Sequence, residues 1–87
     1  MHALVINVTI NDLPAAKAEV EELVPRVSGA PGFVAGYWVA LSRDKGISTV
    51  VFDSEAEAQA GAARAAAGSR VGVTFDSVEV GEVIAHA

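Results

Sequence analysis

Three side chains in this sequence combine a polar atom with an apolar setting. Asn7 lies within the aliphatic and β-branched run His2 to Ile10, where a buried amide needs hydrogen-bond partners. It would serve chemistry as a donor to a bound oxygen, peroxide or substrate enolate. The alternative is an amide bonded to a neighbouring strand end or an ordered water. Tyr37 and Trp38 carry an O–H and an N–H on large rings, which suits an apolar pocket for an aromatic compound.

Tyr37 and Trp38 are neighbours in a segment that is typical of a β-strand. Successive strand residues point to opposite faces of a sheet, so only one of the two rings can line a given cleft. The other ring then packs in the core or against a partner subunit. Asn7, Tyr37 and Trp38 are the catalytic candidates of this sequence, and none of them is a convincing general base.

Other kinds of site find little support. His2 and His86 meet at one end of the sheet if the last strand pairs antiparallel with the first, perhaps near Glu82, but a third metal ligand is missing. We therefore expect solvated histidines, no metal and no cofactor. The chain has no cysteine, no Gly-rich phosphate loop and no nucleophile elbow. Glu19, Glu21 and Glu22 are expected on the wet side of a helix.

Composition limits the classes of partner. The 87 residues suit a single domain, 1–87, and a chain this short gains from burial against a second subunit. A net charge of -5 argues against a nucleic-acid backbone as a partner. The apolar runs are too short for a membrane span, and the N-terminus does not resemble a signal peptide. We expect a soluble cytoplasmic protein that binds neither nucleic acid nor membrane.

The order of elements predicts an α+β fold. Strands are expected over 2–10, 33–41, 47–53 and 71–84, with helices after Asn11–Asp12 and over 54–67. Pro25 should kink the first helix or end it near Val24. Ser54 and Glu57 form a capping-box pattern for the second helix, and Gly81 is a plausible bulge in the last strand.

This β-α-β-β-α-β order is that of the ferredoxin-like fold, with a four-stranded antiparallel sheet and both helices on one face. Right-handed crossovers place the first and third strands at the centre, where we expect them to run parallel to each other.

Two helices shield one face of such a sheet, yet both faces of this one are apolar. The unshielded residues belong to one of two alternative sets: Val5, Val34, Trp38, Val50 and Phe52, or Ile6, Phe33, Tyr37, Val51 and Phe75. Either set exceeds the apolar patch that soluble monomers usually tolerate. We therefore predict an obligate homodimer whose sheets pack face to face.

Three segments support a resemblance to a known family: Pro31-Gly32-Phe33, Gly36-Tyr37-Trp38, and Val50 to Glu55 leading into the second helix. Together they resemble the dimeric α/β barrel superfamily, in particular the branch related to antibiotic-biosynthesis monooxygenases. The resemblance implies two ferredoxin-like protomers forming a barrel, each with a cleft between sheet and helices. Its members include cofactor-independent oxygenases, isomerases, lyases and haem-degrading enzymes; the last would need an axial His that 55–67 lacks.

Two functions from different classes follow. The first is a cofactor-independent monooxygenase acting on a small aromatic or phenolic compound, with Asn7, Tyr37 and Trp38 as hydrogen-bond donors. The second is a non-catalytic homodimer that binds a small ligand or serves as an accessory protein. A third possibility is a structural protein whose selected feature is the dimer surface. A cleft of at least about 300 Å³ on which Asn7 and one aromatic ring converge favours the first two functions, and a cleft filled by its own side chains favours the third.

Overall fold

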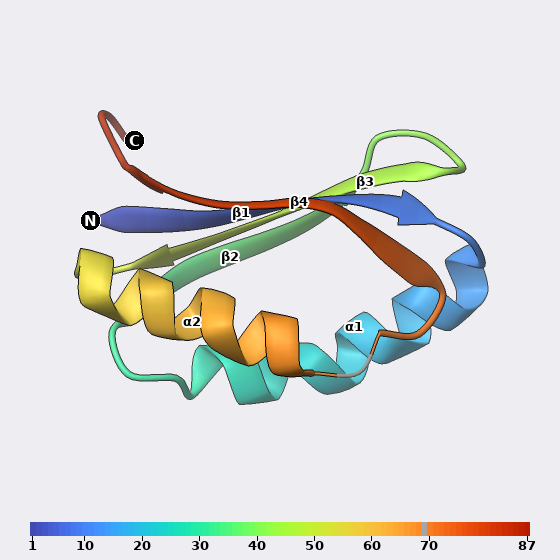
Figure 1. Cartoon of the computed structure of the whole chain (residues 1–87), viewed down its shortest axis with the longest axis horizontal. Helices are drawn as coiled ribbons and strands as arrows, with labels where there is room; N and C mark the ends of the chain where they lie inside the picture. Colours follow the sequence, from blue (N-terminus) through green and yellow to red (C-terminus); the bar gives the residue numbers. More distant parts are fainter. Residues whose placement is uncertain (69) are drawn as a thin grey trace.

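The computed structural model describes residues 1–68 and 70–87. The chain follows the predicted order, which is shown in Figure 1. The elements are β1 (His2–Ile10), α1 (Leu13–Ser28), β2 (Phe33–Ala40), β3 (Lys45–Phe52), α2 (Glu55–Ala67) and β4 (Val73–Glu82). Both helices lie on the same side of the sheet (Figure 1).

The sheet is antiparallel throughout, with strand order β2-β3-β1-β4. The first and third strands are central as predicted, but the expectation that they run parallel is wrong. The crossover through α1 brings β2 back in the direction of β1, and the tight β2–β3 connection then reverses the chain. β3 therefore enters the sheet between β2 and β1 with the opposite direction to both.

The core lies between the sheet and the helices. Alternate residues of β1 are buried on this face, and they meet two residues of β3 and one small residue from each helix. These core residues are Leu4, Ile6, Val8, Ile10, Val50, Phe52, Ala16 and Ala58. Phe52 is the largest fully buried side chain among the described residues, at 1% exposure.

The side of the sheet without helices is called the open face here. It carries Val5, Tyr37, Ile47, Thr49 and Val51, which are cross-strand neighbours in the registers of β1, β2 and β3. This set matches neither of the two predicted alternatives, because both mixed residues from opposite sides of the sheet. The prediction of a second apolar face holds for part of this face only. Over β1, β2 and β3 it is apolar, with Tyr37 64% exposed and Val5 and Val51 half-buried, whereas toward β4 it is polar, with Asn7 bonded to Ser77 and Thr9 to Asp76.

Local signals explain the helix ends. The Asp12 side chain accepts a hydrogen bond from the Ala15 N–H at 3.1 Å and caps α1. At α2, the predicted capping box is confirmed, because Ser54 Oγ accepts from the Glu57 N–H and donates to Glu57 Oε1. Pro25 does not end α1, which continues to Ser28. Pro25 is exposed and lies in the last turn, where it removes one helical hydrogen bond, to the Glu21 carbonyl, without ending the helix.

The bulge of β4 does not lie at Gly81, where it was predicted. Gly81 pairs with Ala3 in regular register. The shift occurs where Asn7 pairs with Ser77 and Val8 with Phe75, which leaves Asp76 as the extra residue. Among the described residues, no helix is long and apolar enough to cross a bilayer.

Candidate ligand cleft between sheet and helices

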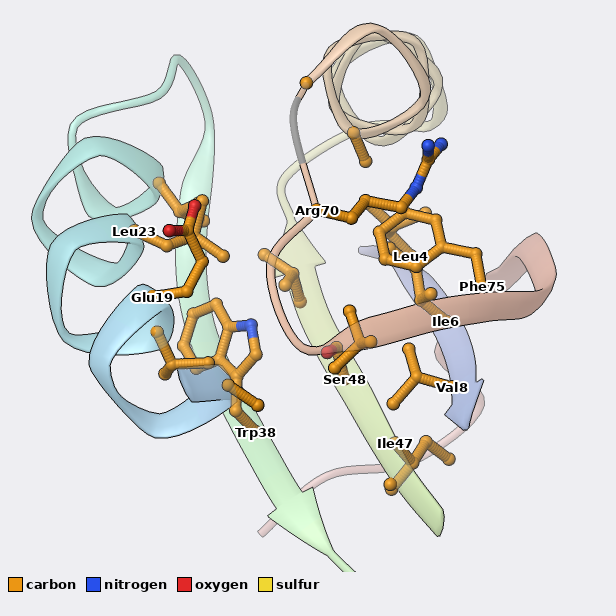
Figure 2. A pocket seen from close by; sticks show the side chains of 18 of the residues that line it. Leu4, Ile6, Val8, Glu19, Leu23, Trp38, Ile47, Ser48, Arg70 and Phe75 are labelled. Atoms are coloured by element: carbon orange, nitrogen blue, oxygen red, sulfur yellow. The ribbon is translucent and has the colours of Figure 1, made fainter. Parts of the chain in front are cut away.

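A cleft of about 660 Å³ opens between α1 and α2 above the centre of the sheet. Its floor is the buried face of β1 and β3, with Leu4, Ile6, Val8 and Val50 among the lining residues. α1 packs over the edge strand β2 and α2 packs over β1, β3 and β4, and the cleft lies between the two helices. Figure 2 shows the view into this space. Its volume exceeds the expected value of about 300 Å³ and Trp38 lines it, but Asn7 does not, so the criterion for a ligand site is met only in part.

Two aromatic side chains stand on opposite sides of this floor. Trp38 comes from β2 and Phe75 from β4, which are the two edge strands of the sheet. In Figure 2 the Trp38 indole lies beside α1, while the Phe75 ring lies on the far side near Leu4 and Ile6. Rings on both sides of an apolar floor are suited to the faces and edges of a flat aromatic ligand.

The position of Trp38 depends on Gly36. The two residues point to the same face of β2, and a Cβ atom at position 36 would lie 2.8 Å from Cη2 of the indole. Such a distance is too short for carbon atoms in contact. Gly36 therefore leaves the space over β2 that the indole occupies.

Polar groups are found around the edge of the cleft. Glu19 of α1 and Ser48 of β3 line it together with Arg70, which precedes β4. The Arg70 guanidinium lies 4.3 Å from the centroid of the Phe75 ring, and one of its N–H groups donates to the Ala66 carbonyl at 3.3 Å. The Glu19 carboxylate is shown beside the cleft above Trp38 in Figure 2. A carboxylate in this place can accept a proton or a hydrogen bond from a ligand.

The structure does not bring the three predicted catalytic residues together. Trp38 lines the cleft, whereas Tyr37 lies on the open face. Asn7 also lies on the open face, and the expectation that it is buried is wrong, because it is exposed and its amide donates to Ser77 Oγ at 3.1 Å. Ile6 and Val8 take the buried positions on either side of it.

Sequence reasoning missed the other polar and aromatic residues of the cleft. Glu19 was assigned to the wet side of α1, although it follows Ala16 by three positions and so shares a helix face with this buried residue. Ser48 is the direct cross-strand partner of Trp38. The bulge at Asp76 turns the Phe75 side chain to the cleft side of the sheet, and the sequence does not predict a bulge at this position.

The histidines differ from the expected solvated pair. The His2 Nε2 atom lies 3.4 Å from a carboxylate oxygen of Glu55, and its side chain is 22% exposed. His2 pairs with Glu82 at the end of the β1–β4 ladder, while His86 is exposed beyond that strand. Within residues 1–68 and 70–87, no three potential ligands cluster in a way that would hold a metal ion.

Comparisons with known proteins give one informative likeness. No family model matches the chain, and no curated protein matches its sequence. Among solved structures, the fold is similar to that of the haem degrader MhuD from Mycobacterium tuberculosis, solved with two haems bound in its active site. The identity is 22%, the match covers 98% of each chain, and the TM-score is 0.57. This likeness confirms the predicted fold, the ferredoxin-like protomer on which dimeric α/β barrels are built.

Proposed function

We propose that this protein binds a flat phenolic compound in the cleft and oxidises it with dioxygen, without a cofactor. The observation that carries the proposal is that Glu19 and Trp38 line the same apolar cleft, with the Glu19 carboxylate at its edge in Figure 2. The cleft thus combines a surface for an aromatic ring with a group that can take a proton from it. The likeness to a haem-degrading enzyme supports an oxygenase on this fold and says nothing about the substrate.

Binding follows from the composition of the lining. The floor is aliphatic, and Trp38 and Phe75 provide the aromatic surfaces. A volume of about 660 Å³ is within the ordinary range for small-molecule sites, roughly 300–1,000 Å³. Burial of a flat ring here removes apolar surface of both protein and ligand from water, and it holds one ring edge toward α1 and Glu19.

The chemistry requires a substrate that can reduce dioxygen once it is deprotonated. In an anthrone-type compound, Glu19 takes a proton from the ring CH₂ group and leaves a stabilised anion. The anion passes one electron to dioxygen, and the radical pair joins through a new C–O bond. The resulting peroxide takes up a proton and loses water to give a C=O group. In sum, CH₂ and O₂ become C=O and H₂O, so the substrate supplies all the electrons.

Haem fits this cleft poorly as a substrate. Iron in haem proteins is held by His, Cys, Met or Tyr side chains. None of these residue types is among the described residues that line the cleft, and α2 contains none of them. His2 lies at the end of the sheet, paired with Glu55. We therefore propose an iron-free aromatic substrate.

One observation favours the alternative of a non-catalytic binding protein. Among the residues that the structure describes, no polar or charged side chain is buried. Electrostatic stabilisation of an anion is strongest where water is excluded, and here the polar groups remain in contact with solvent. A protein that only binds the same aromatic compound needs the apolar floor and the rings alone.

We further propose that the working form is a homodimer in which the open faces of two protomers pack together. Tyr37 is 64% exposed and Val39 46% exposed, and both lie next to Thr49 and Ile47 of β3. A second copy offers the same apolar surface, and a two-fold axis lets each patch cover the other. Most of the cleft lining then remains free, because it lies on the opposite side of each sheet, whereas Val39 and Ile47 belong to both surfaces.

The activity is tested by oxygen consumption with a panel of anthrones and hydroquinones. We expect at least one substrate to give uptake above its spontaneous rate. Glu19→Gln should reduce that uptake by about 10²-fold, the lower range for general base catalysis. Glu22→Gln is the matched control on an exposed part of α1 and should retain the rate. Thermal stabilisation by these compounds without oxygen uptake would instead establish the binding protein.

A further inference from the structure

The charges around the cleft differ from those of the whole chain. The chain holds 6 Lys and Arg residues against 11 Asp and Glu residues. The cleft is lined by 30 of the 87 residues, and these include four of the six cations but only two carboxylates, Glu19 and Glu21. The four cations are Lys17, Arg26, Arg64 and Arg70. An acidic protein therefore becomes locally basic at the place where it has a cavity.

These cations are not engaged by carboxylates of the chain. Among residues 1–68 and 70–87, the ion pairs within 4.0 Å are His2–Glu55 and Lys45–Asp76, and both lie outside the set of cleft cations. Positive groups along a cleft with apolar walls attract an anionic ligand more strongly than the same groups spread over a surface.

Arg70 is the best placed of the four. Its guanidinium lies over the Phe75 ring at 4.3 Å, and its bond to the Ala66 carbonyl occupies one N–H group. A guanidinium has five N–H donors in a plane, so the others remain for a ligand. Two of them in parallel match the two oxygens of a carboxylate. Arg70 thus places a charge next to the aromatic side of the cleft.

We infer that the ligand is an aromatic acid: a flat ring system between Trp38 and Phe75 with a carboxylate directed to Arg70. This inference rests on the proposed binding of an aromatic compound in the cleft, and it adds the chemical class of that compound. Arg26, Arg64 and Lys17 strengthen the positive potential at the same opening. Glu19 stays available at the α1 side for the proton transfer proposed above.

The test uses the fluorescence of Trp38, which is the one tryptophan of the chain and lies in the cleft. Titration with naphthoate and with its neutral amide at neutral pH compares two ligands of nearly equal shape. We expect the acid to bind about tenfold more tightly than the amide, as one charge-assisted contact implies. High salt should reduce this advantage.

Variants test whether Arg70 is responsible for the tighter binding of the acid. Arg70→Gln should remove most of the advantage of the acid while changing the affinity for the amide by less than about twofold. Arg43→Gln is the matched control, because Arg43 is exposed between β2 and β3 and does not line the cleft. If Arg70→Gln lowered the affinities for the acid and the amide equally, Arg70 would have a packing role only, and the inference would be contradicted.

The outcomes separate this inference from the proposed function. Equal affinities for acid and amide in the unmodified protein would overturn the aromatic acid and leave the aromatic cleft standing. If neither compound, nor any phenol of the oxidation panel, quenched Trp38 or raised the melting temperature, the proposed binding function itself would fail.

Discussion

Trp38 and Ser48 are directly opposed in the β2–β3 ladder and share the face of the sheet that the helices cover. The pair places a hydroxyl next to the aromatic wall of the cleft on neighbouring strands. Because α1 lies over β2 and α2 lies over the other strands, this pair is at the boundary between the two helices, where the cleft lies. The cleft is therefore a consequence of how the helices divide the sheet between them.

Loss of the indole should weaken ligand binding at the cleft. Trp38→Ala removes one of the two aromatic surfaces, so we expect the affinity for an aromatic ligand to fall at least tenfold by calorimetry. The free energy of unfolding should fall by about 2 kcal/mol, below the usual cost at fully buried sites because Trp38 is half-buried. Tyr37→Ala, one position away on the open face, should retain the affinity. Equal loss in both variants would contradict the assignment of Trp38 to the cleft.

A methyl group at Gly36 should displace the indole without removing it. The added Cβ would lie 2.8 Å from Trp38 Cη2, and the ring can yield by turning toward the cleft. We expect Gly36→Ala to shift the emission maximum of Trp38 and to weaken ligand binding, with a stability change of only ~1 kcal/mol. An unchanged emission spectrum would show that the indole does not lie over Gly36.

The fold was predictable because its signals are local and agree with one another. The aliphatic and β-branched run 2–10, which ends at Asn11–Asp12, predicted β1 with the observed ends, and the Ser54–Glu57 pattern predicted the start of α2. The predicted direction of the central strands was wrong, because strand direction depends on how the chain connects β1, β2 and β3 and not on any single residue. The helix α1 does not end near Val24, since one hydrogen bond lost to Pro25 is not enough to stop it before Ser28.

The candidate site was harder to predict, because it depends on which side of a strand faces the helices. Asn7 and Trp38 seemed equivalent as polar groups in apolar runs, and the structure assigns them to opposite faces. The choice follows from register and from the bulge at Asp76, which involve residues nearly 70 positions apart in the chain. Glu19 lines the cleft because α1 packs over the edge strand β2, which leaves this part of the helix facing the cleft.

Close contact between α2 and the sheet requires a glycine at position 61. A Cβ there would lie 2.9 Å from Cζ of Phe52, which is 1% exposed. Alanine favours a helix over glycine by about 1 kcal/mol, while overpacking costs about 1–3 kcal/mol. We therefore expect Gly61→Ala to destabilise the protein by ~1 kcal/mol in urea denaturation.

Gly81→Ala is the control for this substitution. A Cβ at Gly81 meets nothing within 4 Å, and alanine is preferred to glycine in a strand by roughly 0.5–1 kcal/mol. Gly81→Ala should therefore leave stability unchanged or raise it slightly. A stabilised Gly61→Ala variant would mean that α2 can move away from Phe52.

Charge on the open face should separate the proposed dimer. Tyr37→Glu and Val39→Glu together place two carboxylates where two apolar sheets would meet, and an unpaired buried charge is strongly unfavourable. Light scattering coupled to size exclusion should give twice 8.9 kDa for the unmodified chain and 8.9 kDa for the double variant. Val24→Glu, at an apolar position on α1 that is 36% exposed, should remain dimeric. A monomer at micromolar concentration for the unmodified chain would show that the open face is stable in water and that the cleft acts in a single subunit.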